Sequence, residues 1–159
     1  MAPISVREVT AENWRDTLRL TVHRDQQRFV ADTAPIAAIA LAKAYIRPGG
    51  LRWVPYAFYA GDTMVGFAAV AYEPHDDGPC WLYHFFIDHR SQRRGFGARA
   101  LHALIQRITD DDTHPQALHL TVHPENTAAQ RLYTGAGFQP TGDALDGEPV
   151  YALPLRGKH

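Results

Sequence analysis

One stretch constrains the fold of this chain more than any other: a continuous apolar run over residues 80–87 that leads into a basic turn. The turn and the residues after it read "DHRSQRRGFGARA" from Asp88 to Ala100, with glycines at Gly95 and Gly97. Beyond the turn, apolar residues recur at the spacing of one helix face: Leu101, Leu104, Ile105 and Ile108. A strand that turns on glycines into a helix gathers free backbone N–H groups at the positive end of the helix dipole. The stretch therefore predicts an anion site.

The turn alone leaves the identity of the anion open. It is not a P-loop, because no Gly-Lys-Ser/Thr follows the glycines. Gly95, Gly97 and Ala100 fit the relaxed G-x-G-x-x-G/A pattern of dinucleotide sites. However, antiparallel hairpins are expected before the turn, and no acidic residue stands where the ribose of a dinucleotide needs one. Two interpretations remain, a coenzyme A pyrophosphate site and a plain strand-to-helix turn with solvated arginines.

Hydrophobic periodicity predicts seven strands and four helices. The expected strands cover residues 4–9, 56–60, 64–72, 80–87, 117–122, 138–142 and 150–155. The first expected helix begins near Trp14, with Leu18 and Thr21 on the same face, and the second covers 35–45. The third begins near Gly97. The fourth begins at Asn126 and closes at Gly135 and Gly137. The segments "HRDQQRFVADT" and "RPGGLRWVP" are expected to be a polar link and a loop. The order β-α-α-β-β-β-α-β-α-β-β predicts an α/β (α+β) domain with a mixed, mostly antiparallel sheet.

Composition narrows the class of protein. A chain of 159 residues predicts a single domain over 1–159, and a net charge of −1 favours neither nucleic acid nor an anionic membrane as partner. Cys80 is the only cysteine, so no internal disulfide forms and a cytoplasmic location is expected. No signal-peptide layout and no membrane-spanning stretch is visible. No metal is expected, because His119 and His123 share a strand face without a third ligand.

A second motif follows the turn after a helix and a strand. It reads "ENTAAQRLYTGAGF" and places Asn126, Ala129, Leu132, Tyr133, Gly137 and Phe138 in one pattern. With "QRRGFGA", this pair resembles the GNAT superfamily of acetyl-CoA-dependent N-acetyltransferases, over nearly the whole chain. The stretches "VTAENWRDTLRLTVHRDQQRFVAD", "MVGFAAV", "WLYHFFIDHRSQRRGFG" and "TGDALDGEPVYAL" are most similar to its bacterial polyamine (spermine/spermidine) acetyltransferase-like branch.

The resemblance implies roles for the coenzyme side, with acetyl-CoA as cosubstrate. The strand edge at Phe85, Phe86 and Ile87 would pair with the pantetheine arm, and Asn126 would bond the same arm as well as cap its helix. The pyrophosphate would lie on the turn, formed by Gln92, Arg93, Arg94, Gly95, Phe96, Gly97 and Ala98. Tyr133 would protonate the leaving thiolate, as a phenol of pKa about 10 can do beside a thiol of pKa about 8.5.

The acceptor side departs from the family pattern. A primary amine has a pKa near 10.4, so a group must take its proton. Where the family often carries a carboxylate, this chain has Tyr83, and the bases considered are His84, Glu73 or a water chain. Contacts with the substrate are expected from the link and the hairpins: Asp25, Gln26, Gln27, Phe29, Asp32, Asp76 and Asp77, with Tyr83. A solvated loop explains the same link residues equally well.

The resemblance thus implies direct acetyl transfer to a primary amine of a small molecule, polyamine-like compounds first. The alternatives are a protein or peptide amine, an amino acid or an antibiotic amine, and a non-catalytic coenzyme A sensor. A homodimer is common in the family, and neither nucleic acid nor membrane is an expected partner.

Overall fold

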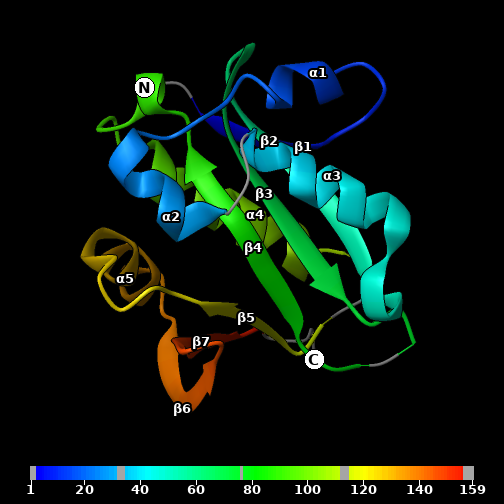
Figure 1. Cartoon of the computed structure of the whole chain (residues 1–159), viewed down its shortest axis with the longest axis vertical. Coiled ribbons are helices and arrows are strands. Elements are labelled where there is room, and N and C mark those ends of the chain that lie inside the picture. The colour runs from blue at the N-terminus through cyan, green and yellow to red at the C-terminus, as the bar shows by residue number, and fades with distance from the viewer. Residues whose placement is uncertain (1–2, 32–34, 76, 112–114, 156–159) are drawn as a thin grey trace.

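In the computed structural model, seven strands form one sheet that helices cover on both faces (Figure 1). The structure describes residues 3–31, 35–75, 77–111 and 115–155. The strand order is β1-β2-β3-β4-β5-β7-β6, and every neighbouring pair is antiparallel except β4 and β5, which run parallel. The mixed, mostly antiparallel seven-stranded sheet expected from the sequence is confirmed.

The elements follow one another along the chain with short connections. The strands are β1 (Ile4–Glu8), β2 (Arg52–Ala60), β3 (Thr63–Tyr72), β4 (Cys80–Ile87), β5 (Ala117–Thr121), β6 (Gln139–Leu145) and β7 (Glu148–Pro154). The α-helices are α1 (Trp14–Thr17), α2 (Gln27–Val30), α3 (Ile36–Ile46), α4 (Phe96–Thr109) and α5 (Thr127–Gly135), and 3-10 turns cover Arg24–Gln26, Pro48–Gly50 and His89–Ser91.

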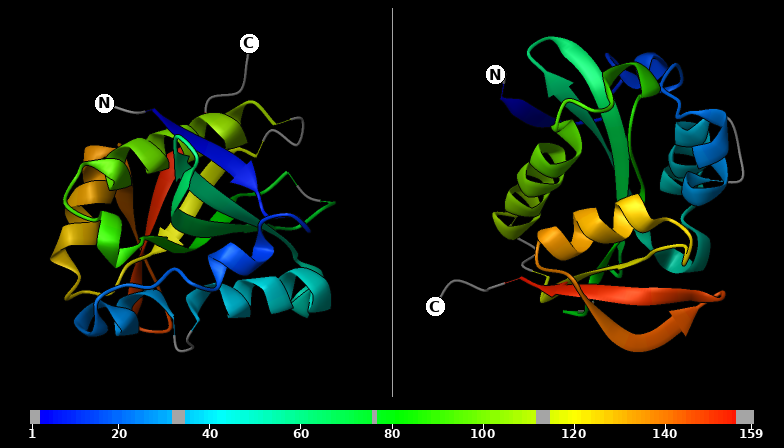
Figure 2. Two further views of the ribbon diagram at one scale, coloured as in Figure 1. Left: turned by 90° about the horizontal axis from the view of Figure 1, so that it is seen from above. Right: turned by 90° about the vertical axis from the view of Figure 1, so that its left-hand side faces the viewer.

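Two apolar cores form, one on each face of the sheet. Helix α4 packs its buried residues, among them Leu101 and Leu104, against one face, and Phe138 and Tyr133 join this core. Helix α3 buries Ile36, Ala37 and Ala40 against the other face (Figure 2). Because β3 is covered on both faces, it reads as a nearly continuous apolar run.

Strands β4 and β5 separate soon after they begin. They pair only at Cys80 with Leu118 and Trp81 with His119. Farther along β4, the register against β3 shifts between Phe67 and Ala69, and His84 takes a φ of 56°. A bulge of this kind bends a strand and redirects its side chains. The two parallel strands therefore diverge and leave an opening between their carboxyl ends.

The first helix is shorter than expected. The sequence predicts Leu18 and Thr21 on one helix face, but α1 ends at Thr17. The N–H groups of residues 18–20 bond to carbonyls three residues back, as in 3-10 turns. Farther on, the Thr21 N–H donates to the Asp88 carboxylate at 2.9 Å and the Thr21 carbonyl accepts from the His89 N–H at 2.7 Å. These bonds satisfy the backbone of Thr21 outside any helix.

Two expectations about irregular segments are also wrong. The polar link contains a 3-10 turn and α2 in its described part. Strand β2 begins at Arg52, inside the expected loop, although it contains Pro55. The Val9 N–H, just after the end of β1, donates to the Pro55 carbonyl. The backbone nitrogen and carbonyl of Pro55 therefore face the β1 side of the strand and not β3. The missing N–H of the proline therefore costs no bond to β3.

Candidate active site

The opening between β4 and β5 holds a cavity of about 340 Å³. Its walls come from β4, from the residues at and after the end of β5, from α5, from residues 91–97 and from the segment around α2. Most of the site residues expected from the sequence line it: Gln26, Phe29, His84, Phe85, Phe86, Ile87, Gln92, Arg93, Gly95, Phe96, Gly97, Asn126 and Tyr133. Segments up to about a hundred residues apart thus meet at one cavity.

The basic turn, residues 88–95, presents backbone N–H groups at the start of α4. Gly95 is the N-cap with a φ of 76°, a left-handed conformation that glycine adopts without a steric penalty, and Arg93 has a φ of 67°. The first N–H groups of α4 have no acceptor within the helix. A Cβ on Gly97 would come within 3.9 Å of Ile87 and Leu132, so this position lies between β4 and α5. The geometry suits an anion at the mouth of the cavity.

Two expected members of the turn do not line the cavity. Arg94 and Ala98 are exposed, and neither contributes to its wall. Arg90, in the same turn, pairs through its Nε with the Asp88 carboxylate at 2.8 Å. Of these arginines, Arg93 lines the cavity, Arg94 does not, and Arg90 is paired with Asp88.

Helix α5 brings Asn126 and Tyr133 to the cavity wall. The Asn126 side chain accepts a hydrogen bond from the Ala129 N–H at 3.2 Å, so the expected helix cap is confirmed. Tyr133 is 8% exposed and contacts Phe85 and Phe138 edge-on, with ring centres 6.4 and 5.6 Å apart. Burial raises the pKa of the Tyr133 phenol well above its usual value. The phenol therefore keeps its proton at any physiological pH.

His84 stands at the bulge in β4. Its Nδ1 lies 2.7 Å from the Val30 carbonyl at the end of α2. A carbonyl only accepts, so Nδ1 carries the proton, and in the neutral ring Nε2 holds the lone pair. His84 thereby connects the cavity wall to the segment that covers it.

Tyr83 lies outside the cavity lining, in an aromatic group on the α3 side of the sheet. Its ring stacks on Trp53 at 4.8 Å, and the Lys43 ammonium lies 4.6 Å from the Trp53 ring centre and 5.9 Å from that of Tyr83. Burial raises the pKa of Tyr83, and the charge of Asp146, in the β6–β7 turn, raises it further. No local sequence signal connects Lys43, Trp53 and Asp146.

The remaining candidates stand apart from the cavity. Asp25, Glu73 and Asp77 are exposed and do not line it, and Glu73 follows the end of β3. Gln27 donates to the Ala31 carbonyl, also outside the lining. Asp32 and Asp76 lie outside the described residues. Cys80 is buried at the start of β4, and burial raises the pKa of its thiol to about 12, as suits a structural cysteine.

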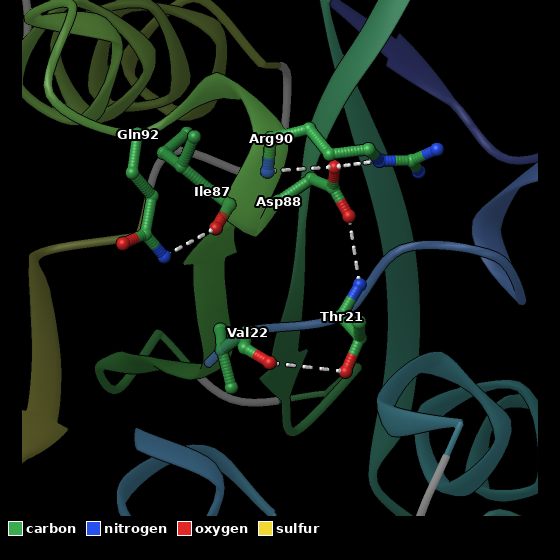
Figure 3. A network of polar contacts seen from close by, with 6 residues as sticks. All are labelled: Thr21, Val22, Ile87, Asp88, Arg90 and Gln92. Carbon is green, nitrogen blue, oxygen red and sulfur yellow. Dashed lines mark hydrogen bonds and ion pairs between the residues drawn. The ribbon is translucent and has the colours of Figure 1, made fainter. Parts of the chain in front are cut away.

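A polar network beside the basic turn was not expected from the sequence. The Asp88 side chain is buried and accepts from the Thr21 N–H, from the Arg90 N–H and from Arg90 Nε (Figure 3). Burial by itself raises the pKa of Asp88, but the bonds from Arg90 and Thr21 outweigh it and hold that pKa below the usual value. Gln92 donates to the Ile87 carbonyl at 3.0 Å and also pairs with Gln26.

The described residues show neither a cluster of metal ligands nor a membrane-spanning helix. Within 3–31, 35–75, 77–111 and 115–155, no group of three or more His, Cys, Asp or Glu side chains is arranged to hold a metal. None of the helices in that part of the chain has the length and apolar character required to cross a membrane.

Among solved structures, the fold is similar to acetyltransferases of different acceptors. Spermidine N-acetyltransferase from Vibrio cholerae, solved with CoA and spermine, superposes with a TM-score of 0.70 at 15% identity, over 96% of this chain and 95% of that one. An acetyltransferase from Salmonella typhimurium that modifies the N-terminal serine of a ribosomal protein gives 0.72 at 13% identity, over 98% and 97%. At such identities the likeness shows the fold alone.

Sequence comparison goes further. Spermine/spermidine N(1)-acetyltransferase of Bacillus subtilis (strain 168) is 34% identical over 158 residues, which cover 96% of this chain and 99% of that protein. The model of the Acetyltransferase (GNAT) family matches residues 10–138, most of the described fold from α1 to the end of α5. The basic turn and the Asn126–Tyr133 helix both lie inside the match. The chain therefore belongs to the acetyltransferase (GNAT) family of N-acetyltransferases.

Proposed function

We propose that this protein transfers the acetyl group of acetyl-CoA to a primary amine of a polyamine-like small molecule. The observation that carries the proposal is the cavity between the diverging strands β4 and β5, which has a helix N-terminus at its mouth and a buried phenol in its wall. The acceptor class is supported by the 34% identity with a spermine/spermidine N(1)-acetyltransferase over nearly the full length of both chains.

For the donor, the pyrophosphate of acetyl-CoA would bind the first N–H groups of α4 and the guanidinium of Arg93. The pantetheine arm would lie between β4 and α5, against the backbone of Phe85 to Ile87 and the Asn126 amide. Both walls line the cavity, and Gly97 lies between them, near Ile87 and Leu132.

For the chemistry, the neutral amine nitrogen attacks the thioester carbonyl carbon, and the carbon–sulfur bond then breaks. Backbone N–H groups near Ile87 would stabilise the oxyanion. The electron pair leaves on sulfur, and Tyr133 gives its proton to the thiolate, later regaining one from solvent. The position of Tyr133 in the cavity wall, beside Phe85, supports this role. Burial raises the pKa of the phenol and disfavours a lasting phenolate, so the ring must regain its proton promptly.

For the proton released by the amine, we assign His84 as the base. Its Nδ1–H is directed at the Val30 carbonyl, which orients Nε2 as the acceptor in the neutral ring. His84 lines the cavity, whereas Glu73 does not. His84 would thus do what a carboxylate at the position of Tyr83 commonly does in the family.

A second acceptor class, an amino acid with a side-chain amine, is favoured by Lys43. The Lys43 ammonium lies over the Trp53 and Tyr83 rings, outside the cavity lining, and the Tyr83 ring centre is 6.0 Å from that of His84. It would attract the carboxylate of an acceptor that extends past His84. The same ammonium opposes a polycation unless the polyamine approaches along Asp146, near Tyr83.

The test is release of free thiol from acetyl-CoA with spermidine, spermine, 2,4-diaminobutyrate and a peptide with a free N-terminus. We expect turnover with the polyamines and much less with the peptide. Preference for the diamino acid would move the proposal to the second class. Coenzyme binding without thiol release from any amine would contradict an enzymatic role.

A further inference from the structure

Two segments far apart in the sequence meet beside the cavity. One is the acceptor segment, residues 23–30, whose Gln26 and Phe29 line the cavity. The other is the basic turn, residues 88–95, which lies at the coenzyme end. Each segment forms a wall for one of the two substrates in the proposed reaction. A contact between them is therefore a route by which one substrate affects the binding of the other.

The two segments share a fixed anchor at Asp88. The Thr21 N–H and carbonyl, two residues before the acceptor segment, bond the Asp88 carboxylate and the His89 N–H. Asp88 is 2% exposed, and its own N–H donates to the Val65 carbonyl in β3. The start of the acceptor segment is thereby tied to the sheet whether or not the cavity is filled.

The second contact is a reciprocal pair of side-chain amides. Gln92 donates to Gln26 Oε1 at 3.0 Å, and Gln26 donates to Gln92 Oε1 at 3.3 Å. Gln92 also donates to the Ile87 carbonyl at 3.0 Å, and the Gln26 oxygen also accepts from the His23 N–H at 3.1 Å. A continuous chain of hydrogen bonds therefore runs from the end of β4, through both amides, to the start of the acceptor segment.

Unlike the Asp88 anchor, the amide pair lies in the cavity wall and is only partly buried. Water in an empty cavity competes for these amides, since they are neutral and accessible. Coenzyme bound against the turn excludes that water and fixes Gln92. Gln92 then holds Gln26, and Gln26 fixes the residues of α2 that meet the acceptor.

We infer that the Gln26–Gln92 pair couples the two substrate sites, so that bound coenzyme orders the acceptor segment and strengthens acceptor binding. The two glutamines act as positioning residues. The ordering of residues 23–30 rests only on the coenzyme site of the proposed function, and the gain in acceptor affinity rests on its acceptor as well. Coupling between sites in proteins is commonly about fivefold or more in affinity, which sets the size of the expected effect.

The first experiment follows amide hydrogen exchange of residues 24–30 with and without saturating coenzyme A. We expect coenzyme to slow exchange in the wild-type protein and to have no such effect in Gln26→Ala or Gln92→Ala, although both bind coenzyme at saturation. Gln106→Ala, which removes an exposed amide on α4, is the control and should behave as wild type. Slowing of exchange in both variants as in wild type, or no slowing in wild type, would overturn the inference.

The second experiment measures spermidine affinity by calorimetry in the presence and absence of coenzyme A. The expected coenzyme-dependent gain of about fivefold should vanish in each single variant. The double variant should lose no more than either single one, because one contact is removed in all three. Equal thermal midpoints would show that the loss is not one of stability. If wild type binds no spermidine, the proposed acceptor fails, while the exchange experiment still decides the coupling.

Discussion

The two ends of the cavity are built from different kinds of contact. At the coenzyme end, residues 92–98 and the start of α5 offer backbone N–H groups, a left-handed glycine and a capped helix. At the acceptor end, Gln26, Phe29 and His84 offer side chains from three separate places in the chain, backed by the Trp53–Tyr83 stack. The first end depends on local backbone shape, and the second depends on which side chains tertiary packing brings together.

Under the proposed function, this difference would allow one fold to serve different acceptors. Backbone groups bind the same pyrophosphate whatever side chains surround them, so one turn can serve many acceptors. The acceptor end can change residue by residue without disturbing that turn. Here Tyr83 stands where a carboxylate is common, and the aromatic group with Lys43 surrounds it. Substitutions at the two ends should therefore separate turnover, coenzyme affinity and acceptor preference.

The largest effect is expected from Tyr133→Phe, which keeps the ring and its contacts with Phe85 and Phe138 but removes the proton donor. Turnover should fall by about 10² to 10⁴-fold, the usual range for general acid catalysis, while calorimetry shows unchanged coenzyme affinity. Tyr45→Phe is the control, since Tyr45 is 87% exposed. Wild-type turnover in Tyr133→Phe would remove Tyr133 from the acid role.

His84→Asn tests the acceptor end. Asparagine tolerates the left-handed backbone of His84, so the bulge should survive. Turnover should fall by about 10²-fold at neutral pH, the lower end for a general base, because water can also take the proton. Since the amine has a pKa near 10.4, raising the pH supplies neutral amine and should partly restore the rate. A pH profile parallel to that of wild type would show that His84 is not the base.

Gly95→Ala tests the coenzyme end without touching the acceptor. An alanine at a φ of 76° is strained by about 1–2 kcal/mol. We expect the turn to relieve this strain by shifting the backbone N–H groups away from the proposed position of the pyrophosphate. Coenzyme affinity should weaken by about tenfold, and acceptor preference should stay the same. Gly135→Ala is matched to it, because a Cβ there meets no atom within 4 Å. Equal coenzyme affinity in the two variants would contradict the role given to the turn.

The last prediction concerns Asp88, which joins the two ends, and its effect is on stability with little expected on activity. Its folded pKa is below the usual value, so its stabilising contribution is present above the unfolded pKa of about 3.9 and is lost as the pH falls through the folded pKa. Asp88→Asn should lower the free energy of unfolding by about 2 kcal/mol at neutral pH. In urea titrations, the gap between wild type and variant should narrow below about pH 4. A gap that is constant with pH would show that the charge of Asp88 contributes nothing.

The sequence was sufficient for the parts of the molecule that depend on neighbouring residues. The strand over residues 80–87, the helices after Gly95 and Asn126 and the cap at Asn126 all follow from local pattern. Two of the features it missed depend on partners more than sixty residues away. Asp88 takes the Thr21 N–H outside any helix, and the Gln26–Gln92 pair spans 66 positions.

The same reasoning explains the uncertain base. From the sequence, Tyr83 stands at the position where the family often carries a carboxylate, and His84, Glu73 or a water chain are considered as the base in its place. What distinguishes them is position: Glu73 follows the end of β3, Tyr83 packs against Trp53, and the bulge brings His84 to the cavity. The bulge at His84, with its left-handed backbone, could not be predicted from the hydrophobic pattern. Apolar residues continue on both sides of His84, so the segment reads as one uninterrupted strand.

The central claim is that coenzyme A lies in the opening between β4 and β5, and amide NMR of the isotope-labelled protein tests it most directly. On titration with coenzyme A, we predict the largest shifts at the N–H groups of the basic turn and the start of α4, with further shifts at Phe85, Ile87 and Asn126. The groove between α4 and α5, lined by His102 and Arg131, is the comparison surface. Shifts confined to that groove, with residues 85–97 unchanged, would contradict the account.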